Sequence, residues 1–152
     1  MTLPRFVLAV VVSASAATAA AQPPATPRRL TLDDHARLVT LGDPQRSPDG
    51  VWVAYTVTAI DAEKDTRNTD LWMARWDGTA QQQLTSSLDN ETAPRWSPDG
   101  KYLAFLSARG SDDDKKKGAQ LWLLPSQGGE AQKISDVKGG LADIQWSSAS
   151  RA

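Results

Sequence analysis

Two aspartates at matching places are the first candidates for chemistry in this sequence. Asp49 and Asp99 lie 50 residues apart, each inside the tetrapeptide Ser-Pro-Asp-Gly. A pair of carboxylates can act as acid and base or can hold a hard cation. However, Pro presets the backbone at the second position of a turn, Asp bonds neighbouring amides, and Gly accepts a positive φ. The tetrapeptide therefore predicts two hairpin turns rather than two catalytic acids or metal ligands.

The other acidic and basic candidates lack partners. His35 is the one histidine in the chain, and its only near carboxylates are Asp33 and Asp34, whereas catalytic and zinc sites need several placed residues. The acidic run 112–114 could attract a hard cation. The alternating ligands and terminal Glu of an EF-hand are missing, however, and three lysines follow at 115–117. We expect neither place to be a functional site.

Nucleophilic chemistry has no support either. The chain has no cysteine and no Gly-x-Ser-x-Gly sequence, and Ser111, which follows Gly110, lies in a charged segment without a strand-turn-helix context. We therefore predict no catalytic, cofactor-binding or metal-ligating residue among the 152 residues, and no cofactor.

The composition is that of an ordinary globular chain. It is 40% hydrophobic and 23% charged, with 10 Gly and 9 Pro, which argues against disorder. The formal net charge is -1 and the basic residues are scattered along the chain. We therefore expect neither nucleic acid nor an anionic membrane as a partner.

Residues 1–21 have the pattern of a secretory signal peptide. Arg5 precedes a short apolar run, and the small residues Ala19 and Ala21 suit signal peptidase. We expect cleavage before Gln22, which predicts a periplasmic or secreted protein with no transmembrane segment after cleavage. A retained N-terminal anchor is the alternative, which the short apolar run disfavours.

Residues 22–42 are expected to form an extended lead and then one short helix. The prolines of 22–29 resist regular hydrogen bonding. Thr31 and Asp34 have the spacing of a capping box, and Gly42 is placed to stop a helix.

A repeat of 50 residues organises the rest of the chain. Segment 70–85, DLWMARWDGTAQQQLT, aligns without a gap to segment 120–135, QLWLLPSQGGEAQKIS, and Trp96 aligns with Trp146. A period near 50 with short strands is typical of propeller-like arrays rather than of helical solenoids, whose repeats show a period of 3.6.

Each repeat divides into four short strands. After an initial strand we expect strands at 51–58, 70–75 and 81–85 in the first repeat, and in the second at 93–97, 101–107, 120–124 and 131–135. Strand 101–107 is largely apolar on both faces, which indicates packing between two neighbouring sheets. The sequence thus predicts an all-β fold, an incomplete β-propeller over residues 43–152 with two four-stranded blades and the start of a third.

Tryptophans and charged connectors are the remaining conspicuous features. Five tryptophans occupy strand positions and are interpreted as packing residues, since each can bury about 200 Å²: Trp52, Trp72, Trp96, Trp122 and Trp146. The charged segments 59–69 and 108–119 both join a second strand to a third, so we expect them on one rim, as solvated connectors or as partner-binding loops.

Three stretches resemble a known family: LGDPQRSPDGVWVAYTV, DLWMARWDGTAQQQLT and APRWSPDGKYLAFLS. They are similar to the N-terminal propeller of secreted prolyl oligopeptidase-family serine peptidases, especially the acylaminoacyl-peptidase and dipeptidyl-aminopeptidase-like branch, and to TolB-type propellers. The resemblance covers about 33–146 and is more specific for fold than for activity. In this family the propeller caps an α/β-hydrolase domain and restricts access to short peptides. The catalytic Ser, Asp and His belong to that domain, and no position of this sequence matches them.

The resemblance implies a noncatalytic propeller fragment of a secreted serine peptidase, which would gate peptide access to a hydrolase domain that these residues do not include. The alternative is a TolB-like periplasmic module that binds a protein partner. After Ser147 the expected Pro-Asp-Gly is replaced by Ser-Ala-Ser, so a third blade is only begun. A truncated or frame-shifted product and a naturally short protein both stay open. Two open blades expose strand edges, so we also expect self-association through them.

Overall fold

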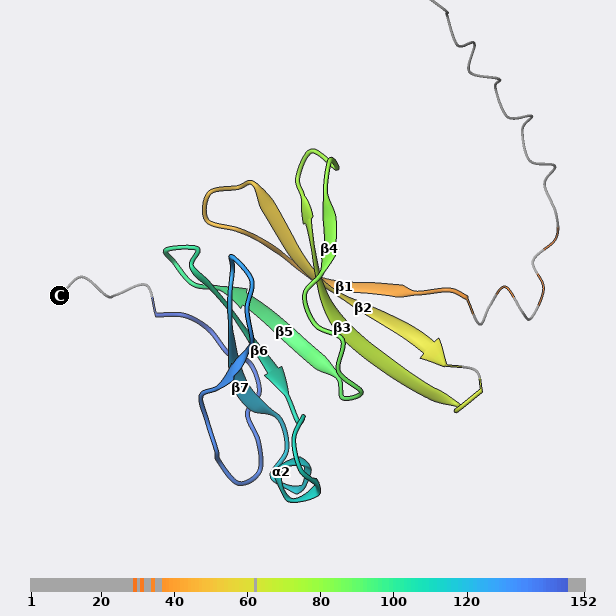
Figure 1. Ribbon diagram of the computed structural model, residues 1–152, viewed down its shortest axis with the longest axis vertical. Helices are drawn as coiled ribbons and strands as arrows, with labels where there is room; N and C mark the ends of the chain where they lie inside the picture. Colours follow the sequence, from red (N-terminus) through yellow and green to blue (C-terminus); the bar gives the residue numbers. More distant parts are fainter. Residues whose placement is uncertain (1–28, 30, 32–33, 35–36, 62, 148–152) are drawn as a thin grey trace, which may run out of the picture.

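The computed structural model describes residues 29, 31, 34, 37–61 and 63–147. Their strands form two four-stranded antiparallel sheets, in the orders β1-β2-β3-β4 and β5-β6-β7-β8. The strands are β1 (Thr40–Arg46), β2 (Trp52–Asp61), β3 (Thr66–Arg75), β4 (Gln81–Gln83), β5 (Glu91–Trp96), β6 (Tyr102–Ser107), β7 (Gln120–Pro125) and β8 (Gln132–Lys133). Figure 1 shows the sheets side by side. We call them blade 1 and blade 2, and the predicted all-β, propeller-type fold is confirmed.

The same hairpin opens each blade. The turn between β1 and β2 contains Gly50 with φ of 73°, and the turn between β5 and β6 contains Gly100 with φ of 71°. An L side chain rarely adopts this backbone conformation, so Gly is the residue that permits both turns. The chain then runs through neighbouring strands in sequence order, which places the fourth strand at an outer edge.

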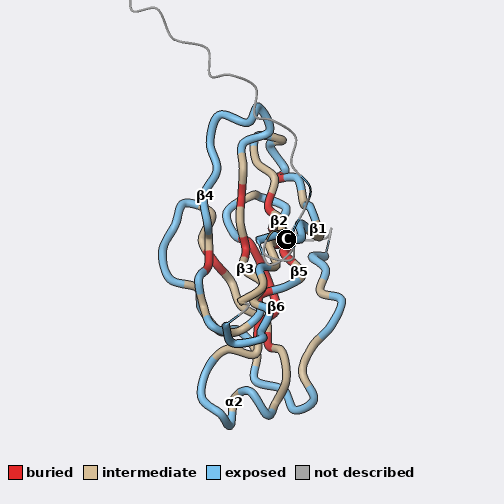
Figure 2. The backbone as a smooth tube through the Cα atoms, turned by 90° about the vertical axis from the view of Figure 1, so that its right-hand side faces the viewer, coloured by how far each residue is buried: buried red, intermediate tan, exposed pale blue. Residues whose placement is uncertain are grey.

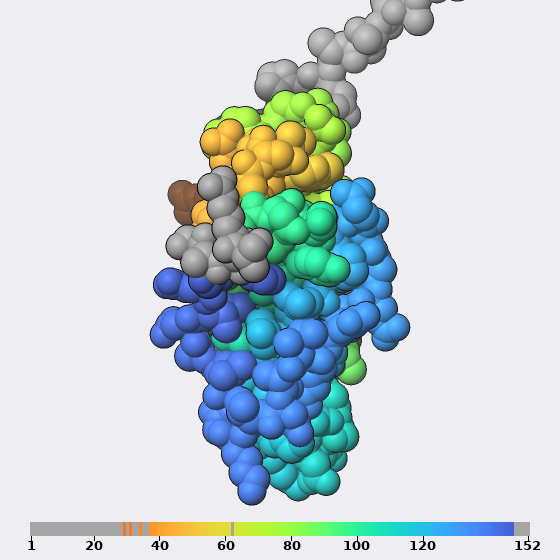
Figure 3. Space-filling view, turned by 90° about the vertical axis from the view of Figure 1, so that its left-hand side faces the viewer, coloured from red at the N-terminus to blue at the C-terminus, as the bar shows by residue number. Residues whose placement is uncertain are grey.

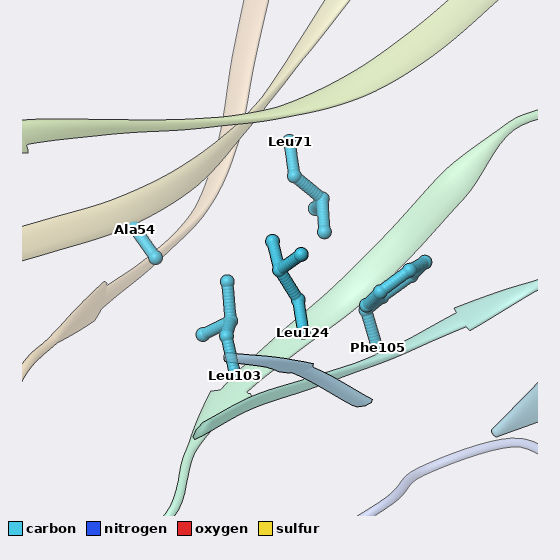
Figure 4. Packing of buried hydrophobic residues seen from close by; sticks show 5 residues of the cluster. All are labelled: Ala54, Leu71, Leu103, Phe105 and Leu124. Carbon is cyan, nitrogen blue, oxygen red and sulfur yellow. The ribbon is translucent and has the colours of Figure 1, made fainter. Parts of the chain in front are cut away.

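The core lies between the two blades. Ala54 and Leu71 of blade 1 face Leu103, Phe105 and Leu124 of blade 2 (Figure 4), and all five side chains are buried. Burial is concentrated in the middle strands, as the red segments in Figure 2 show. Because this interface removes apolar surface from water, it joins the blades into one unit.

Strand β6 is covered on both of its faces, as its composition predicts. Leu103 and Phe105 point into the core, while Ala104 and Leu106, on the opposite face, are also buried. Tyr102 is the exception, because its side chain stays 42% exposed.

The two charged connectors are more regular than the sequence suggests. β2 continues to Asp61 and β3 starts at Thr66, so most of the expected connector 59–69 is paired strand. Segment 108–119 contains the short helix α2 (Asp112–Lys116), which Ser111 caps through a reciprocal capping box with Asp114. In the first case cross-strand pairing stabilises the segment, and in the second a helix cap does so.

The start of blade 1 also differs from expectation. β1 begins at Thr40, so Gly42 lies inside a strand and does not stop a helix. A Cβ at Gly42 would lie 2.9 Å from Oγ1 of Thr56 on β2, which explains the glycine. Upstream, the backbone N–H and the hydroxyl of Thr31 donate to Oδ2 of Asp34 at 2.8 and 2.9 Å. The expected signal peptide, His35 and most of the lead and short helix lie outside the described residues.

Residues 141–147 begin the third repeat and keep part of the blade geometry. Asp143 has φ of 52°, as Asp43 (45°) and Ala93 (54°) have at the equivalent places in β1 and β5. At these places the register of β1 and of β5 against the next strand shifts, which marks a bulge. The positive φ therefore recurs with the repeat, although 141–147 forms no strand in the described structure.

Candidate functional site

A groove of about 620 Å³ opens between the two blades at the end that carries the Ser-Pro-Asp-Gly turns. We call it the turn-end groove. Figure 3 looks onto this end, with the first turn (orange) above the second (green). The repeat brings equivalent residues of both blades to one place, since Asp49 and Trp52 of blade 1 line the groove together with Asp99 and Tyr102 of blade 2.

The hydrogen bonds of each turn fix its aspartate. The Ser47 hydroxyl donates to Oδ1 of Asp49 at 2.5 Å, and the same oxygen accepts from the backbone N–H of Val51 at 3.0 Å. The hydroxyl oxygen of Ser47 in turn accepts from the backbone N–H of Trp52 at 2.9 Å. One serine and one aspartate thus satisfy the donors at the start of β2.

Blade 2 repeats this arrangement. The Ser97 hydroxyl donates to Oδ1 of Asp99 at 2.7 Å, and that oxygen accepts from the backbone N–H of Lys101 at 3.1 Å. The Ser97 hydroxyl accepts from the backbone N–H of Tyr102 at 3.0 Å. The two turns therefore present equivalent carboxylates at the groove.

The hydrogen bonds keep both carboxylates ionised. The bond from the Ser47 hydroxyl, and after it the bond from the Val51 N–H, lowers the pKa of Asp49. The Ser97 hydroxyl and the Lys101 N–H lower the pKa of Asp99 in the same way. A group whose pKa is already below the ordinary aspartate range holds no proton to give at neutral pH. These aspartates can attract a cation or an amino terminus, but they are unsuited to general acid catalysis.

Aromatic, apolar and polar side chains form the rest of the groove, and Lys101 among them has its Nζ 3.4 Å from Oδ2 of Asp99. The guanidinium of Arg75 lies 5.6 Å from the ring centroid of Trp52, within reach of a cation–π contact. Met73 is buried and lines the groove, and Tyr102 is partly exposed there. Rings beside carboxylates suit an extended peptide, because rings pack against apolar side chains and carboxylates attract its cationic groups.

The acidic run of 112–114 lies elsewhere. It forms the first turn of α2, at the opposite end of blade 2 from the Ser-Pro-Asp-Gly turn (Figure 1). Oδ1 of Asp114 accepts from Nζ of Lys133 at 2.7 Å, and this bond is the largest of the causes that lower the pKa of the Asp114 carboxyl. Within the residues described, no group of three or more histidine or acidic side chains is placed to hold a metal ion.

The contacts that align the two blades were not predicted from the sequence. Nη1 of Arg95 in β5 donates to Oδ2 of Asp43 in β1 at 2.8 Å, and the indole Nε1–H of Trp96 donates to the carbonyl oxygen of Gln45 at 3.0 Å. The alignment of Trp96 with Trp146 was the available signal. That alignment indicated packing. It could not identify the acceptor, because every residue type has a backbone carbonyl.

This geometry defines two consecutive β-propeller blades with an open groove between their turns. Comparison with known proteins supports the assignment to the β-propeller class. Residues 51–123 match the family described as "Acylamino-acid-releasing enzyme, N-terminal domain". The match runs from the exit of the first turn into β7 and includes four of the five core residues, Ala54, Leu71, Leu103 and Phe105.

Relatives and solved structures point the same way. The "Uncharacterized peptidase YuxL" of Bacillus subtilis is 36% identical over 118 residues, which is 78% of this chain and 17% of that protein. A dipeptidyl-peptidase 5 of Porphyromonas gingivalis is 33% identical over 85 residues, covering 56% of this chain and 12% of that protein. The β-propeller domain of the Trilobed protease from Pyrococcus furiosus superposes with a TM-score of 0.53 at 27% identity, over 68% of this chain and 29% of that one.

These matches identify the two blades as an N-terminal propeller part of a prolyl oligopeptidase-family peptidase. The chain spans less than a fifth of the length of the curated relatives named here.

Proposed function

We propose that this chain is the noncatalytic propeller part of a secreted serine peptidase, and that it controls the access of short peptides to an α/β-hydrolase domain outside these residues. The observation that carries the proposal is the family match over 51–123, which includes most of the core between the two blades. Two relatives are named as a peptidase and a dipeptidyl-peptidase, and these names support a role as part of a peptidase.

The turn-end groove is the proposed contact for the peptide. It carries the ionised Asp49 and Asp99 beside the rings of Trp52 and Tyr102. A peptide with a free amino terminus would place its ammonium group near the carboxylates and an apolar side chain against a ring. The Ser47 and Ser97 hydroxyls are held by the turn carboxylates and by backbone N–H groups, and no histidine is among the residues that line the groove, which fits a role in selection rather than in bond cleavage.

Secretion and domain limits belong to the same proposal. The segment 1–21 supports export, with a mature chain that begins at Gln22, a lead and short helix up to 42, and the propeller part from there to 152. Among the described residues, no helix has the length and apolar character needed to cross a membrane.

A peptide titration of the isotope-labelled mature chain tests the proposal. Free and N-acetylated tripeptides with one apolar side chain are added, and the indole N–H signals of the tryptophans are followed by NMR. We expect shifts centred on Trp52 and Trp96, with the free tripeptide binding at least threefold more tightly than the acetylated one. The same samples should not hydrolyse a chromogenic dipeptide substrate.

Two variants sharpen the result. Tyr102→Ala should weaken peptide binding at least threefold because it removes a ring from the groove, whereas Leu88→Ala, at a side chain 95% exposed and outside the groove, should leave binding unchanged. Turnover of the substrate would contradict a noncatalytic role. Absence of shifts at the groove tryptophans would contradict peptide gating and would leave the TolB-like protein-binding module as the alternative.

A further inference from the structure

A second hollow of about 530 Å³ is lined from both blades and shares no lining residue with the turn-end groove. We call it the Arg109 hollow. Leu84 in the segment after β4, and Trp122 and Leu124 of β7, give it an apolar wall. These three side chains belong to the core between the blades or pack against it, which fixes their positions. The volume lies within the range of sites that bind small molecules.

Arg109 brings a positive charge into the lining of this hollow. Its guanidinium carbon lies 3.9 Å from the centroid of the Trp122 ring and 5.3 Å from that of the Phe105 ring, so the group is held by stacking. Within the described residues the guanidinium makes one hydrogen bond, from Nη2 to the carbonyl oxygen of Ala131, and its length of 3.5 Å makes it weak. A guanidinium presents five N–H donors. Most of them therefore have no acceptor in the described structure.

Two acidic side chains act on Arg109, but neither occupies its donors. Nη1 of Arg109 lies 3.8 Å from Oε1 of the fully buried Glu91, which is too far for a hydrogen bond. Burial is the largest cause that raises the pKa of Glu91, and it disfavours the ionised form that would neutralise the arginine. Glu130, in the lining of the hollow, is exposed to water, which screens its charge. Arg109 thus keeps a positive charge without a hydrogen-bonded carboxylate among the described residues.

Blade 1 shows that the blade architecture does not need an arginine at this place. At the repeat offset of 50 residues, Trp122 corresponds to Trp72, so the ring recurs, whereas Arg109 corresponds to Ala59. Ala59 is part of β2 and carries no polar side chain. The ring therefore belongs to the packing that both blades share, and the charged group stacked on it is an addition of blade 2.

We propose that the Arg109 hollow binds the C-terminal carboxylate of a short peptide whose last side chain is apolar. The two carboxylate oxygens match the fork of the guanidinium, and such charge-assisted pairs are stronger than neutral hydrogen bonds. The last side chain packs against Trp122 and Leu84 in the apolar wall. The choice of a peptide over another apolar acid rests on the proposed function.

The charges of the two hollows are complementary to the two ends of a peptide. The turn-end groove carries the ionised Asp49 and Asp99, which attract an amino terminus, whereas the Arg109 hollow carries a guanidinium, which attracts a carboxylate. Burial lowers the pKa of Arg109, but a guanidinium stays charged at neutral pH. A partly dehydrated cation gains more from an anionic ligand than one in open water does.

Titration of the isotope-labelled mature chain with N-acetyl-Gly-Phe tests the proposal. The acetyl group blocks the amino terminus that the turn-end groove would attract, so this ligand probes the Arg109 hollow. The reporter is the indole N–H of Trp122, which donates to the carbonyl oxygen of Ser107 at 3.2 Å. We expect its NMR signal to shift, and the free acid to bind about tenfold more tightly than the C-terminal amide. Phenylpropionate has the ring and the carboxylate but fills less of the hollow, so it should bind about threefold more weakly than the peptide acid.

Substitutions locate the contact. Arg109→Gln removes the charge and should weaken binding of the acid about tenfold while leaving the amide unchanged. Arg109→Lys keeps the charge but loses the planar fork, so it should recover only part of the affinity. Glu130→Gln removes an acidic side chain from the lining and should tighten binding of the acid about twofold. Arg67→Gln, at an exposed arginine of β3 outside the hollow, is the matched control and should bind as the wild type does.

The comparison of acid and amide uses the wild-type chain, so the proposal stays falsifiable if Arg109→Gln fails to fold. Equal affinities of acid and amide would overturn it, as would a Trp122 signal that does not move or phenylpropionate that binds as tightly as the peptide acid. These results differ from a failure of the proposed function, which would appear as an absence of shifts at Trp52 and Trp96 with a peptide that has a free amino terminus.

Discussion

The indole N–H of Trp96 donates to the carbonyl oxygen of Gln45 across the blade junction at 3.0 Å, and Trp146 makes the same bond to the carbonyl oxygen of Arg95 at 2.9 Å. The donor and the acceptor are 51 residues apart in both cases. The start of the third repeat is therefore docked on blade 2 in the way that blade 2 is docked on blade 1.

Replacing Trp96 by Phe should lower the free energy of unfolding by about 1–3 kcal/mol, because it leaves the partly buried carbonyl of Gln45 without its donor. Trp146→Phe is the matched control. Trp146 is 39% exposed, so water can reach the Arg95 carbonyl and the loss should stay below about 1 kcal/mol. Urea unfolding measures both, and equal losses would contradict a special role for Trp96.

Ala93→Gly should stabilise the chain by about 1 kcal/mol. Ala93 has φ of 54°, a conformation that costs a residue with a Cβ about 1–2 kcal/mol and glycine little. Ala59→Gly, on β2 with an ordinary φ, should instead destabilise by about 0.5–1 kcal/mol. Thermal unfolding of the two variants should therefore show melting temperatures that move in opposite directions. A lower melting temperature for Ala93→Gly would contradict the strain.

The ion pair of Asp43 with Arg95 should contribute about 0.5–1 kcal/mol, since its two side chains are 32% and 29% exposed. A double-mutant cycle with Asp43→Asn and Arg95→Gln measures the coupling, and Asn tolerates the positive φ of position 43. The coupling should shrink at about 0.5 M salt. The exposed pair of Lys116 with Asp113 is the control and should show no measurable coupling. Equal couplings for both pairs would be the contrary result.

Removing the Ser97 hydroxyl should change both the free energy of unfolding and the pKa of Asp99. Ser97→Ala leaves the N–H of Tyr102 without its acceptor, which should cost about 1–2 kcal/mol. It also removes the bond that chiefly lowers the pKa of Asp99, so that pKa should rise toward the ordinary value. A carboxylate whose pKa is lowered by folding stabilises the folded state above the ordinary aspartate pKa, and this stabilisation is lost as the pH falls. Because the variant lacks most of this stabilisation, its free energy of unfolding should fall less on acidification than that of the wild type. NMR titration of Asp99 checks this, and an unchanged pKa would contradict it.

The sequence predicted the strands well because alternation and turn chemistry are local. The Ser-Pro-Asp-Gly tetrapeptides mark both opening hairpins, and the apolar positions of 101–107 fit a strand covered on both faces. The prediction failed where pairing across strands or a cap decided the structure. β2 and β3 extend through a polar connector, and α2 starts at a Ser-Asp capping box inside a segment that otherwise reads as a solvated loop.

The candidate site was harder to predict because it arises between repeats. The spacing of Asp49 and Asp99 was plain, but the groove exists only because the blades stack with both turns at one end. The positive φ at positions 43, 93 and 143 could not be predicted from a shared residue type either. Positions 43 and 143 are aspartate, but position 93 is alanine, which rarely adopts a positive φ.

The spacing of the tryptophan bonds has a consequence for the order of assembly during translation. β4 ends at Gln83 before Trp96 is synthesised, and β8 ends at Lys133 before Trp146 is synthesised. Each acceptor carbonyl therefore belongs to a blade whose four strands have already left the ribosomal active site when its indole donor is made. Because N-terminal parts fold first during synthesis, each finished blade can serve as the template on which the next one starts.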